Sequence, residues 1–239
     1  MLILALDTTT RGGSAAIMRD DELVSLIPGN AARTHGERLP GEIDRALVEA
    51  GIAARDLDLL VVASGPGAFT GLRIGLAAIQ GIAMVTGVPV VGVSALDALA
   101  EATWPAIDTP PNDRRLIAWM DAQRGEVFEG RYRTSADATW TLDAVPRVGT
   151  PQDLLSSLPP SWHDASFVGD GTNRYRAAVN DWSAAARIVE TPQALAPALA
   201  RIGRRRAAAG TAGPPHVLQP LYVRRPDAVL ERERRTEPA

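Results

Sequence analysis

Residues 2–12 read LILALDTTTRG, and residues 115–125 follow the same pattern as RLIAWMDAQRG. Each stretch has an apolar segment typical of a buried strand, then an aspartate, a short polar turn and an Arg-Gly pair. The second turn is one residue shorter than the first. The segments that follow each stretch also correspond in type and order. The sequence therefore predicts an α/β protein in which one structural unit occurs twice.

The first unit has the predicted order βββαβαβα. Thr34 and Glu37 have the spacing of a capping box at a helix start, and Ser94 with Asp97 has the same spacing before a later helix. Gly51 is typical of a residue that ends a helix. The predicted segments are strands at 2–7, 14–18 and 22–27, a helix at 34–51, a strand at 57–63, a helix at 70–86, a strand at 88–93 and a helix from 94 to about 102.

The second unit follows a proline-rich, polar break at 105–114, and we expect the same order of elements in it. Thr150-Pro151 and Thr191-Pro192 both have the pattern of a helix start, and Pro197 is expected to distort the second of these helices. The other predicted segments are strands at 126–132, 139–145, 166–168 and 187–190 and a helix at 172–182. The predicted division is a first lobe at 1–104, a second lobe at 105–213 and a charged tail at 214–239, which begins proline-rich and is expected to end in a solvated, partly frayed segment.

Composition excludes several kinds of chemistry. The chain has no cysteine, which excludes disulfides, thiol nucleophiles and cysteine-bound zinc. All 25 basic residues are arginine, which excludes a P-loop lysine and Schiff-base chemistry. The net charge of −3 gives no general reason to expect affinity for nucleic acids or membranes. No apolar run approaches the roughly 18 residues of a membrane span, and we expect a cytoplasmic protein.

A glycine loop, SGPGAFTGLRIG at residues 64–75, joins the fourth predicted strand to the helix at 70–86. It lacks the Walker A lysine, and Gly65, Gly67 and Gly71 have one residue too many for a dinucleotide fingerprint. Pro66 also removes a backbone donor. A generic phosphate site at the helix start stays open as an alternative. We favour a structural role, in which the glycines let the strand turn sharply into a closely packed helix.

The helix at 70–86 is apolar nearly all round, with Arg73 and Gln80 as its strongly polar side chains. Such a helix is buried on most sides, by its own domain and by something else. We therefore predict a face for a partner subunit on this helix and the helix at 34–51. The residues predicted to form it are Leu39, Ile43, Leu47, Leu72, Ile74, Gly75, Ala78 and Ile82.

Other candidate residues have a functional and a structural interpretation. Asp7 with Thr8 and Thr9, together with Gly65 and Gly67, could line a phosphate cleft, or Asp7 could instead stabilise the turn that follows it. His35 is expected at a surface or interface rather than in acid–base catalysis. The arginines at 201–206 and 223–225 are expected on a solvated face, unless a partner aligns them into a groove for tRNA phosphates.

Several motifs together resemble the TsaB (YeaZ) family. They are GPGAFTGLRIG, the later GVPVVGVSALDALA, and the earlier LALDTTT and HGERLP. The resemblance is strong over residues 1 to about 104 and weaker through MDAQRGEVF, VGDG and PLYVR. It implies a duplicated RNase H-like fold of the actin, sugar-kinase and Hsp70 type, with one unit in each lobe.

The resemblance also implies a function in tRNA threonylcarbamoyladenosine formation. It implies a non-catalytic subunit that binds a TsaD-like transferase and a TsaE-like ATPase, forms a homodimer when alone and meets tRNA only through the complex. The catalytic paralogue carries a metal-binding histidine pair on one helix. Those positions fall on Ala95 and Leu99 here, so we expect no metal and no cofactor. An ATP-binding phosphotransferase or ATPase of the same fold is the alternative, and a protease is disfavoured because no G-x-S-x-G elbow is present.

Overall fold

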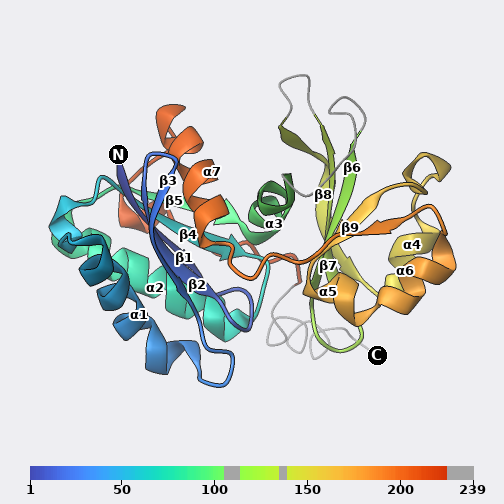
Figure 1. Cartoon of the computed structure of the whole chain (residues 1–239), viewed down its shortest axis with the longest axis horizontal. Helices are drawn as coiled ribbons and strands as arrows, with labels where there is room; N and C mark the ends of the chain where they lie inside the picture. Colours follow the sequence, from blue (N-terminus) through green and yellow to red (C-terminus); the bar gives the residue numbers. More distant parts are fainter. Residues whose placement is uncertain (105–113, 135–138, 225–239) are drawn as a thin grey trace, which may run out of the picture.

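The computed structural model describes residues 1–104, 114–134 and 139–224 and contains two five-stranded mixed sheets (Figure 1). The first has the strand order β3-β2-β1-β4-β5. Its elements are β1 (Leu2–Asp7), β2 (Ser14–Arg19), β3 (Glu22–Pro28), α1 (His35–Ala50), β4 (Leu59–Gly65), α2 (Phe69–Thr86), β5 (Val90–Ser94) and α3 (Ala95–Thr103).

The second sheet repeats this arrangement as β8-β7-β6-β9-β10. In each sheet the first strand of the unit pairs antiparallel with the second and parallel with the fourth. The predicted duplication of an α/β unit is therefore confirmed. The elements are β6 (Arg115–Asp121), β7 (Val127–Thr134), β8 (Trp140–Gly149), α4 (Pro151–Ser156), β9 (Ser166–Val168), α5 (Asp170–Arg174), α6 (Arg176–Trp182), β10 (Arg187–Ile188) and α7 (Ala196–Ala208).

Two helix predictions in the second unit are wrong. The helix expected at 172–182 is two helices, α5 and α6, which meet at Tyr175. The last helix begins at Ala196 and not at Thr191-Pro192. Pro197 therefore lies in the first turn of α7, where its missing N–H leaves no helical hydrogen bond unmade, and the expected distortion does not arise.

A shared apolar core lies between the two sheets. It combines one face of each sheet with α3 and α7, and α3 contacts strands of both sheets. Polar contacts cross the same layer, since Asp97 of α3 accepts hydrogen bonds from the Tyr132 hydroxyl (2.9 Å) and from Arg206 (2.9 Å). The two lobes are thus one packed unit at this layer.

Helix α7 packs on β1, β2, β4 and β5 of the first sheet, although the sequence places it in the second lobe. The backbone N–H of Ala196 also donates to Ser14 Oγ of β2 at 3.1 Å. The lobe limits at 104 and 213 stay predictions, and the break at 105–113 lies outside the described residues.

The first part of the predicted tail, residues 214–224, is described by the structure, and its apolar residues pack against the first lobe. Leu218 is 8% exposed and packs in the core of the first sheet, and the Leu221 N–H donates to the Ser64 carbonyl at 2.6 Å. The apolar side chains of this segment anchor it, despite the arginines that follow. Residues 225–239 of the predicted tail lie outside the described residues.

Helix α2 differs from the expectation that no segment resembles a membrane span, because its length and composition alone would allow it to cross a membrane. Core helices can share these properties. Leu72, Leu76 and Ile79 are buried in the core of the first sheet, and the helix also contacts α1. One side of α2 is therefore used within the chain, and its opposite side is open.

Gly203→Ala tests the packing of α7 on the first sheet. A Cβ at position 203 would lie 2.4 Å from Cγ2 of Val61, a fully buried β-branched residue. Overpacking of this kind costs about 1–3 kcal/mol, and we expect the free energy of unfolding in urea to fall by that amount.

Gly81→Ala in α2 is the matched control, because nothing lies within 4 Å of its added Cβ. Alanine at a helix interior should stabilise the protein by about 0.5–1 kcal/mol. Equal stabilisation by both variants would contradict the described position of α7.

Candidate functional site

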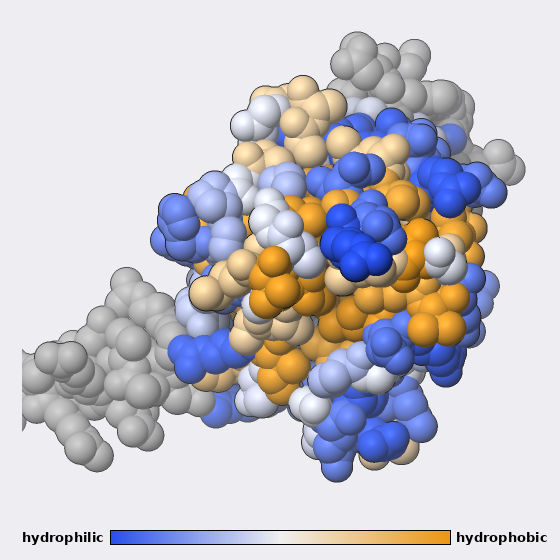
Figure 2. All heavy atoms as spheres, turned by 90° about the vertical axis from the view of Figure 1, so that its left-hand side faces the viewer, coloured by the Kyte–Doolittle hydropathy of each residue, from blue (hydrophilic) through white to orange (hydrophobic). Residues whose placement is uncertain are grey.

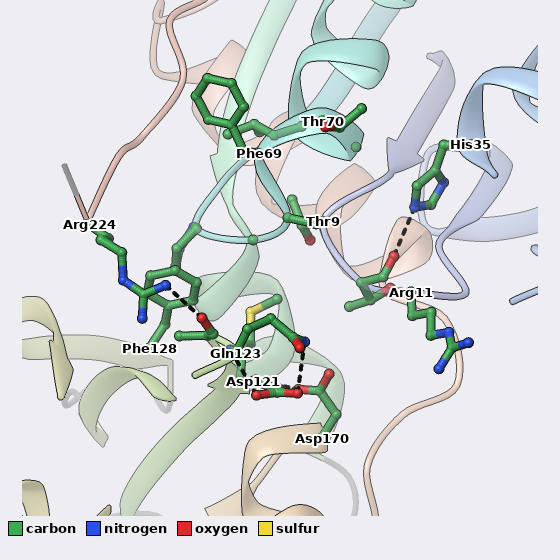
Figure 3. A pocket seen from close by; sticks show the side chains of 18 of the residues that line it. Thr9, Arg11, His35, Phe69, Thr70, Asp121, Gln123, Phe128, Asp170 and Arg224 are labelled. Carbon is green, nitrogen blue, oxygen red and sulfur yellow. Dashed lines mark hydrogen bonds between the residues drawn. The ribbon is translucent and has the colours of Figure 1, made fainter. Parts of the chain in front are cut away.

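A cleft of about 1000 Å³ lies between the lobes. The turn after β1, the glycine loop and the start of α1 form its wall on the first lobe. The turn after β6, the start of α5 and residues 221–224 complete it (Figure 3). Of the five residues predicted to line a phosphate cleft, Thr9 and Gly67 line it, whereas Asp7, Thr8 and Gly65 are not part of its wall.

Asp7 is 2% exposed and bonds to its own turn. Its Oδ1 accepts from the Thr9 N–H (2.8 Å) and the Thr9 hydroxyl (2.6 Å), and its Oδ2 accepts from the Thr10 hydroxyl (2.8 Å). These are the bonds of an Asx-type turn, which the structural interpretation of Asp7 predicted. The carboxylate oxygens already have partners that a metal-bound water or phosphate would have to replace.

The glycine loop closes on the same turn. A Cβ on Gly67 would lie 2.5 Å from Thr9 Cβ, one on Gly71 would lie 2.3 Å from the Thr8 carbonyl oxygen, and one on Gly75 would lie 2.2 Å from Thr8 Oγ1. The glycines are thus required by contacts inside the chain. This agrees with the favoured structural role of the loop and leaves phosphate binding a prediction.

His35 fastens the start of α1 to the same turn. Its Nε2 lies 3.0 Å from the Thr10 carbonyl oxygen, and its Nδ1 lies 2.8 Å from Arg38 Nη2. A carbonyl only accepts and a guanidinium only donates, so the ring is neutral with its proton on Nε2. Burial, and next the Arg38 charge, lower the pKa of His35 below its ordinary value of 6.5. The ring therefore acts as a structural link between α1 and the turn.

Arg38 is itself buried and completes this link. Its guanidinium donates to Glu42 at 2.6 Å and to the Gly12 carbonyl. Glu37 accepts from the Thr34 N–H (2.9 Å) and the Thr34 hydroxyl (2.7 Å), which agrees with the predicted cap at this helix start. The amino end of α1 is held by several charged hydrogen bonds.

Two aspartates form the wall of the second lobe. Asp121 accepts from Arg174 Nη1 (2.8 Å) and the Gln123 N–H (2.9 Å), and Asp170 accepts from the Asp121 N–H (3.0 Å) and the Gly171 N–H (2.9 Å). Burial raises the pKa of Asp170 above its ordinary value. Both face the cleft in Figure 3. Asp121 has the position in the second repeat that Asp7 has in the first. Asp170 was not among the predicted site residues, although it lies in the VGDG motif.

In the described part of the chain, no group of three or more His, Asp or Glu side chains is placed to hold a metal. Ala95 and Leu99, the positions at which the family resemblance implies histidines in the catalytic paralogue, are 0% and 2% exposed and pack in the core between the sheets. Three arginines near the carboxyl end of α7 are paired with acidic residues. Arg204 contacts Asp21, Arg205 contacts Glu101 and Arg206 contacts Asp97.

Only four of the eight residues predicted for the partner face have appreciable exposed surface. Leu39, Ile43 and Leu72 are at most 9% exposed, and Gly75 is buried against Thr8, so none of these four can meet a partner. Amphipathic spacing identified the apolar side of α1 but not its direction, which is toward the sheet. The other four, Leu47, Ile74, Ala78 and Ile82, are half-buried: they pack partly against the core of the first sheet and keep part of their surface exposed, and Ile74 also lines the cleft.

Exposed apolar residues that were not predicted add to the exposed apolar surface of α1 and α2. Val48 of α1 is 70% exposed, and Met84 and Val85 at the end of α2 are 78% and 89% exposed. We call Leu47, Val48, Ile74, Ala78, Ile82, Met84 and Val85 the outer helix face. Hydrophobic residues gather on the side of the molecule that carries α1 and α2 (Figure 2).

Comparisons with known proteins agree with one another. Residues 24–212 match the family model described as TsaD, tRNA N6-adenosine threonylcarbamoyltransferase. The chain is 34% identical to the tRNA threonylcarbamoyladenosine biosynthesis protein TsaB of Haemophilus influenzae, over 73% of this chain and 74% of that protein. It is 30% identical to TsaB of Escherichia coli, over 68% of this chain and 69% of that protein.

Solved structures give the same result. YeaZ from Pseudomonas aeruginosa is 27% identical to this chain and superposes with a TM-score of 0.75, over 92% of this chain and 99% of that one.

His35→Gln tests the neutral histidine. The unfolded chain binds more protons than the folded one below pH of about 6.5, because the folded pKa of His35 is the lower one. This contribution to stability is complete above that pH and is lost as the pH falls. Glutamine can donate to Thr10 and accept from Arg38 without titrating, so we expect the melting temperature of His35→Gln to fall less between pH 7 and pH 5 than that of the parent.

His216→Gln is the control, because His216 is exposed. It should keep the parent's pH dependence. An unchanged pH dependence in His35→Gln would contradict the assigned role of His35.

Proposed function

This chain belongs to the TsaB (YeaZ) family and has a role in tRNA threonylcarbamoyladenosine biosynthesis, and from this we propose that it is the non-catalytic, partner-binding subunit of the transferase. In this proposal it binds a TsaD-type catalytic paralogue, and a TsaE-type ATPase joins the assembly. The chain forms a homodimer when TsaD is absent, works in the cytoplasm and contacts tRNA only through the complex.

The buried positions of Ala95 and Leu99 carry the non-catalytic part of the proposal. Apolar side chains there fill core volume between the two sheets, so this helix has no histidine pair for a metal. The turn at Asp7 adds support, because its carboxylate accepts three hydrogen bonds from its own threonines.

The outer helix face carries the partner-binding part of the proposal. Exposed apolar side chains on two adjacent helices are typical of a protein–protein interface. The α1 and α2 helices contact each other, so Val48 and Val85 belong to one helix pair on the first lobe. A second copy of this chain or the TsaD paralogue would cover the same side chains.

The interlobe cleft supports the alternative function, an ATP-binding phosphotransferase or ATPase. Its volume of about 1000 Å³ is sufficient for a nucleotide. Two observations weigh against it: the glycine loop is closed on the turn after β1, and the chain has no lysine to contact the phosphates.

Val85→Glu tests the partner face. A carboxylate in an apolar interface has to be desolvated without a partner, and we expect Val85→Glu to weaken binding to the organism's TsaD by about tenfold or more, which corresponds to about 1.4 kcal/mol. Size-exclusion chromatography and calorimetry of the mixed proteins measure this loss.

Val145→Glu is the matched control, since Val145 is 83% exposed on β8 of the second lobe and is the same residue type. It should leave the complex intact. Full binding by Val85→Glu and by Ile82→Glu would show that another surface meets TsaD.

Calorimetry with ATP and magnesium separates the two functions. The isolated chain should give no binding heat, because the loop and Asp7 are occupied by contacts within the chain. Micromolar affinity for ATP would favour the alternative.

A further inference from the structure

The segment after α7 returns to the first lobe and is fixed there. Gly213 and Val90 exchange backbone hydrogen bonds at 2.8 and 3.1 Å, and Gln80 of α2 donates to the Pro215 carbonyl at 3.1 Å. Leu218 is buried in the core between the sheet and α2. The chain therefore enters the cleft from a firm anchor on the first lobe.

Residues 221 and 222 then contact the glycine loop and the start of α2. The Leu221 N–H donates to the Ser64 carbonyl at 2.6 Å, and the Tyr222 ring stacks on Phe69 with ring centres 5.5 Å apart. The Arg73 guanidinium lies over the Phe69 ring, 3.9 Å from its centre, and Arg73 Nε donates a hydrogen bond to the Tyr222 hydroxyl at 3.3 Å. Aromatic stacking and a cation on the ring hold this part of the segment.

Gly65 provides the space for this crossing. A Cβ on Gly65 would lie 2.7 Å from the Leu221 carbonyl oxygen, so a larger residue would push the segment away from the loop. The φ of Gly65 is +114°, which also favours glycine. The path of residues 221–224 past the glycine loop thus requires a glycine at position 65.

Arg224, two residues after Tyr222, contacts the second lobe. Its Nη1 donates to the Ala122 carbonyl at 2.7 Å, its Nη2 pairs with Glu126, and its guanidinium lies 5.7 Å from the centre of the Phe128 ring. All three partners belong to β7 or the turn before it. Figure 3 shows Arg224 next to Phe128 at one side of the cleft, with Phe69 on the lobe across from it.

We propose that residues 221–224 are an intramolecular clamp that fixes the distance between the two lobes across the cleft. The chain itself supplies a link that spans both lobes, and widening the cleft requires Arg224 to leave Ala122 and Glu126. The clamp is a property of the isolated chain and does not depend on the proposed partner or on the transferase.

The clamp can be tested by distance measurement between spin labels, because the chain has no native cysteine to label by accident. Ala53→Cys on the first lobe and Ala177→Cys on the second are both exposed sites. Labelled chain diluted in unlabelled chain removes distances between copies. The parent should give one narrow distance distribution.

Arg224→Glu should broaden that distribution and move its mean, because it places a carboxylate against Glu126 and the Ala122 carbonyl. Arg19→Glu, at an exposed site at the end of β2, should leave it narrow. Combining Arg224→Glu with Glu126→Arg should narrow the distribution again, which a general loss of stability would not do.

A second variant tests whether the change in distance comes from loss of the clamp and not from a local change around Arg224. Tyr222→Ala removes the anchor on the first lobe and should broaden the distribution in the same way. Circular dichroism should show both variants folded. Parent-like distance distributions in both Arg224→Glu and Tyr222→Ala would overturn the proposal.

Discussion

The contact between the turn after β1 and the inner side of α2 is the constraint on which the rest of the structure depends. Thr8 lies so close to α2 that Gly71 and Gly75 have no room for a Cβ. The close contact of Thr8 with α2 also places Gly67 of the glycine loop against Thr9 and sets the direction of α2 across the sheet. His35 and Arg38 add α1 to the same turn. One backbone approach thus sets the positions of the loop, both helices and one wall of the cleft.

The duplication could be predicted because it depends on local pattern. Alternating apolar strands, turn aspartates and cap residues such as Ser94 are decided within a few residues. The direction of the apolar helix faces could not be predicted this way. Leu39 and Ile43 have the spacing of an apolar stripe whether a sheet or a partner covers them. Only the packing of α1 on β2 and β3 shows that the sheet does.

Long-range contacts explain the other differences between sequence and structure. Leu218 and Tyr222 lie in a stretch rich in proline and arginine, and no short window links them to Phe69, some 150 positions earlier. The same holds for α7, whose Gly203 fits against Val61 of the first sheet. Asp170 was missed for the same reason: the VGDG motif contains it, but its hydrogen bond from the Asp121 N–H joins residues 49 positions apart.

Helix α2 joins these observations in one element. Its inner side needs small residues because Thr8 approaches it, and this side is closed to any partner. Its outer side keeps Val85 exposed and Ile82 partly exposed, although Ile82 also packs against the core of the first sheet. Its first turn, with Phe69 and Arg73, holds Tyr222 at the cleft. A protein bound to the outer helix face would therefore sit on the same rigid helix that anchors the segment between the lobes, which gives partner binding and cleft geometry a shared support.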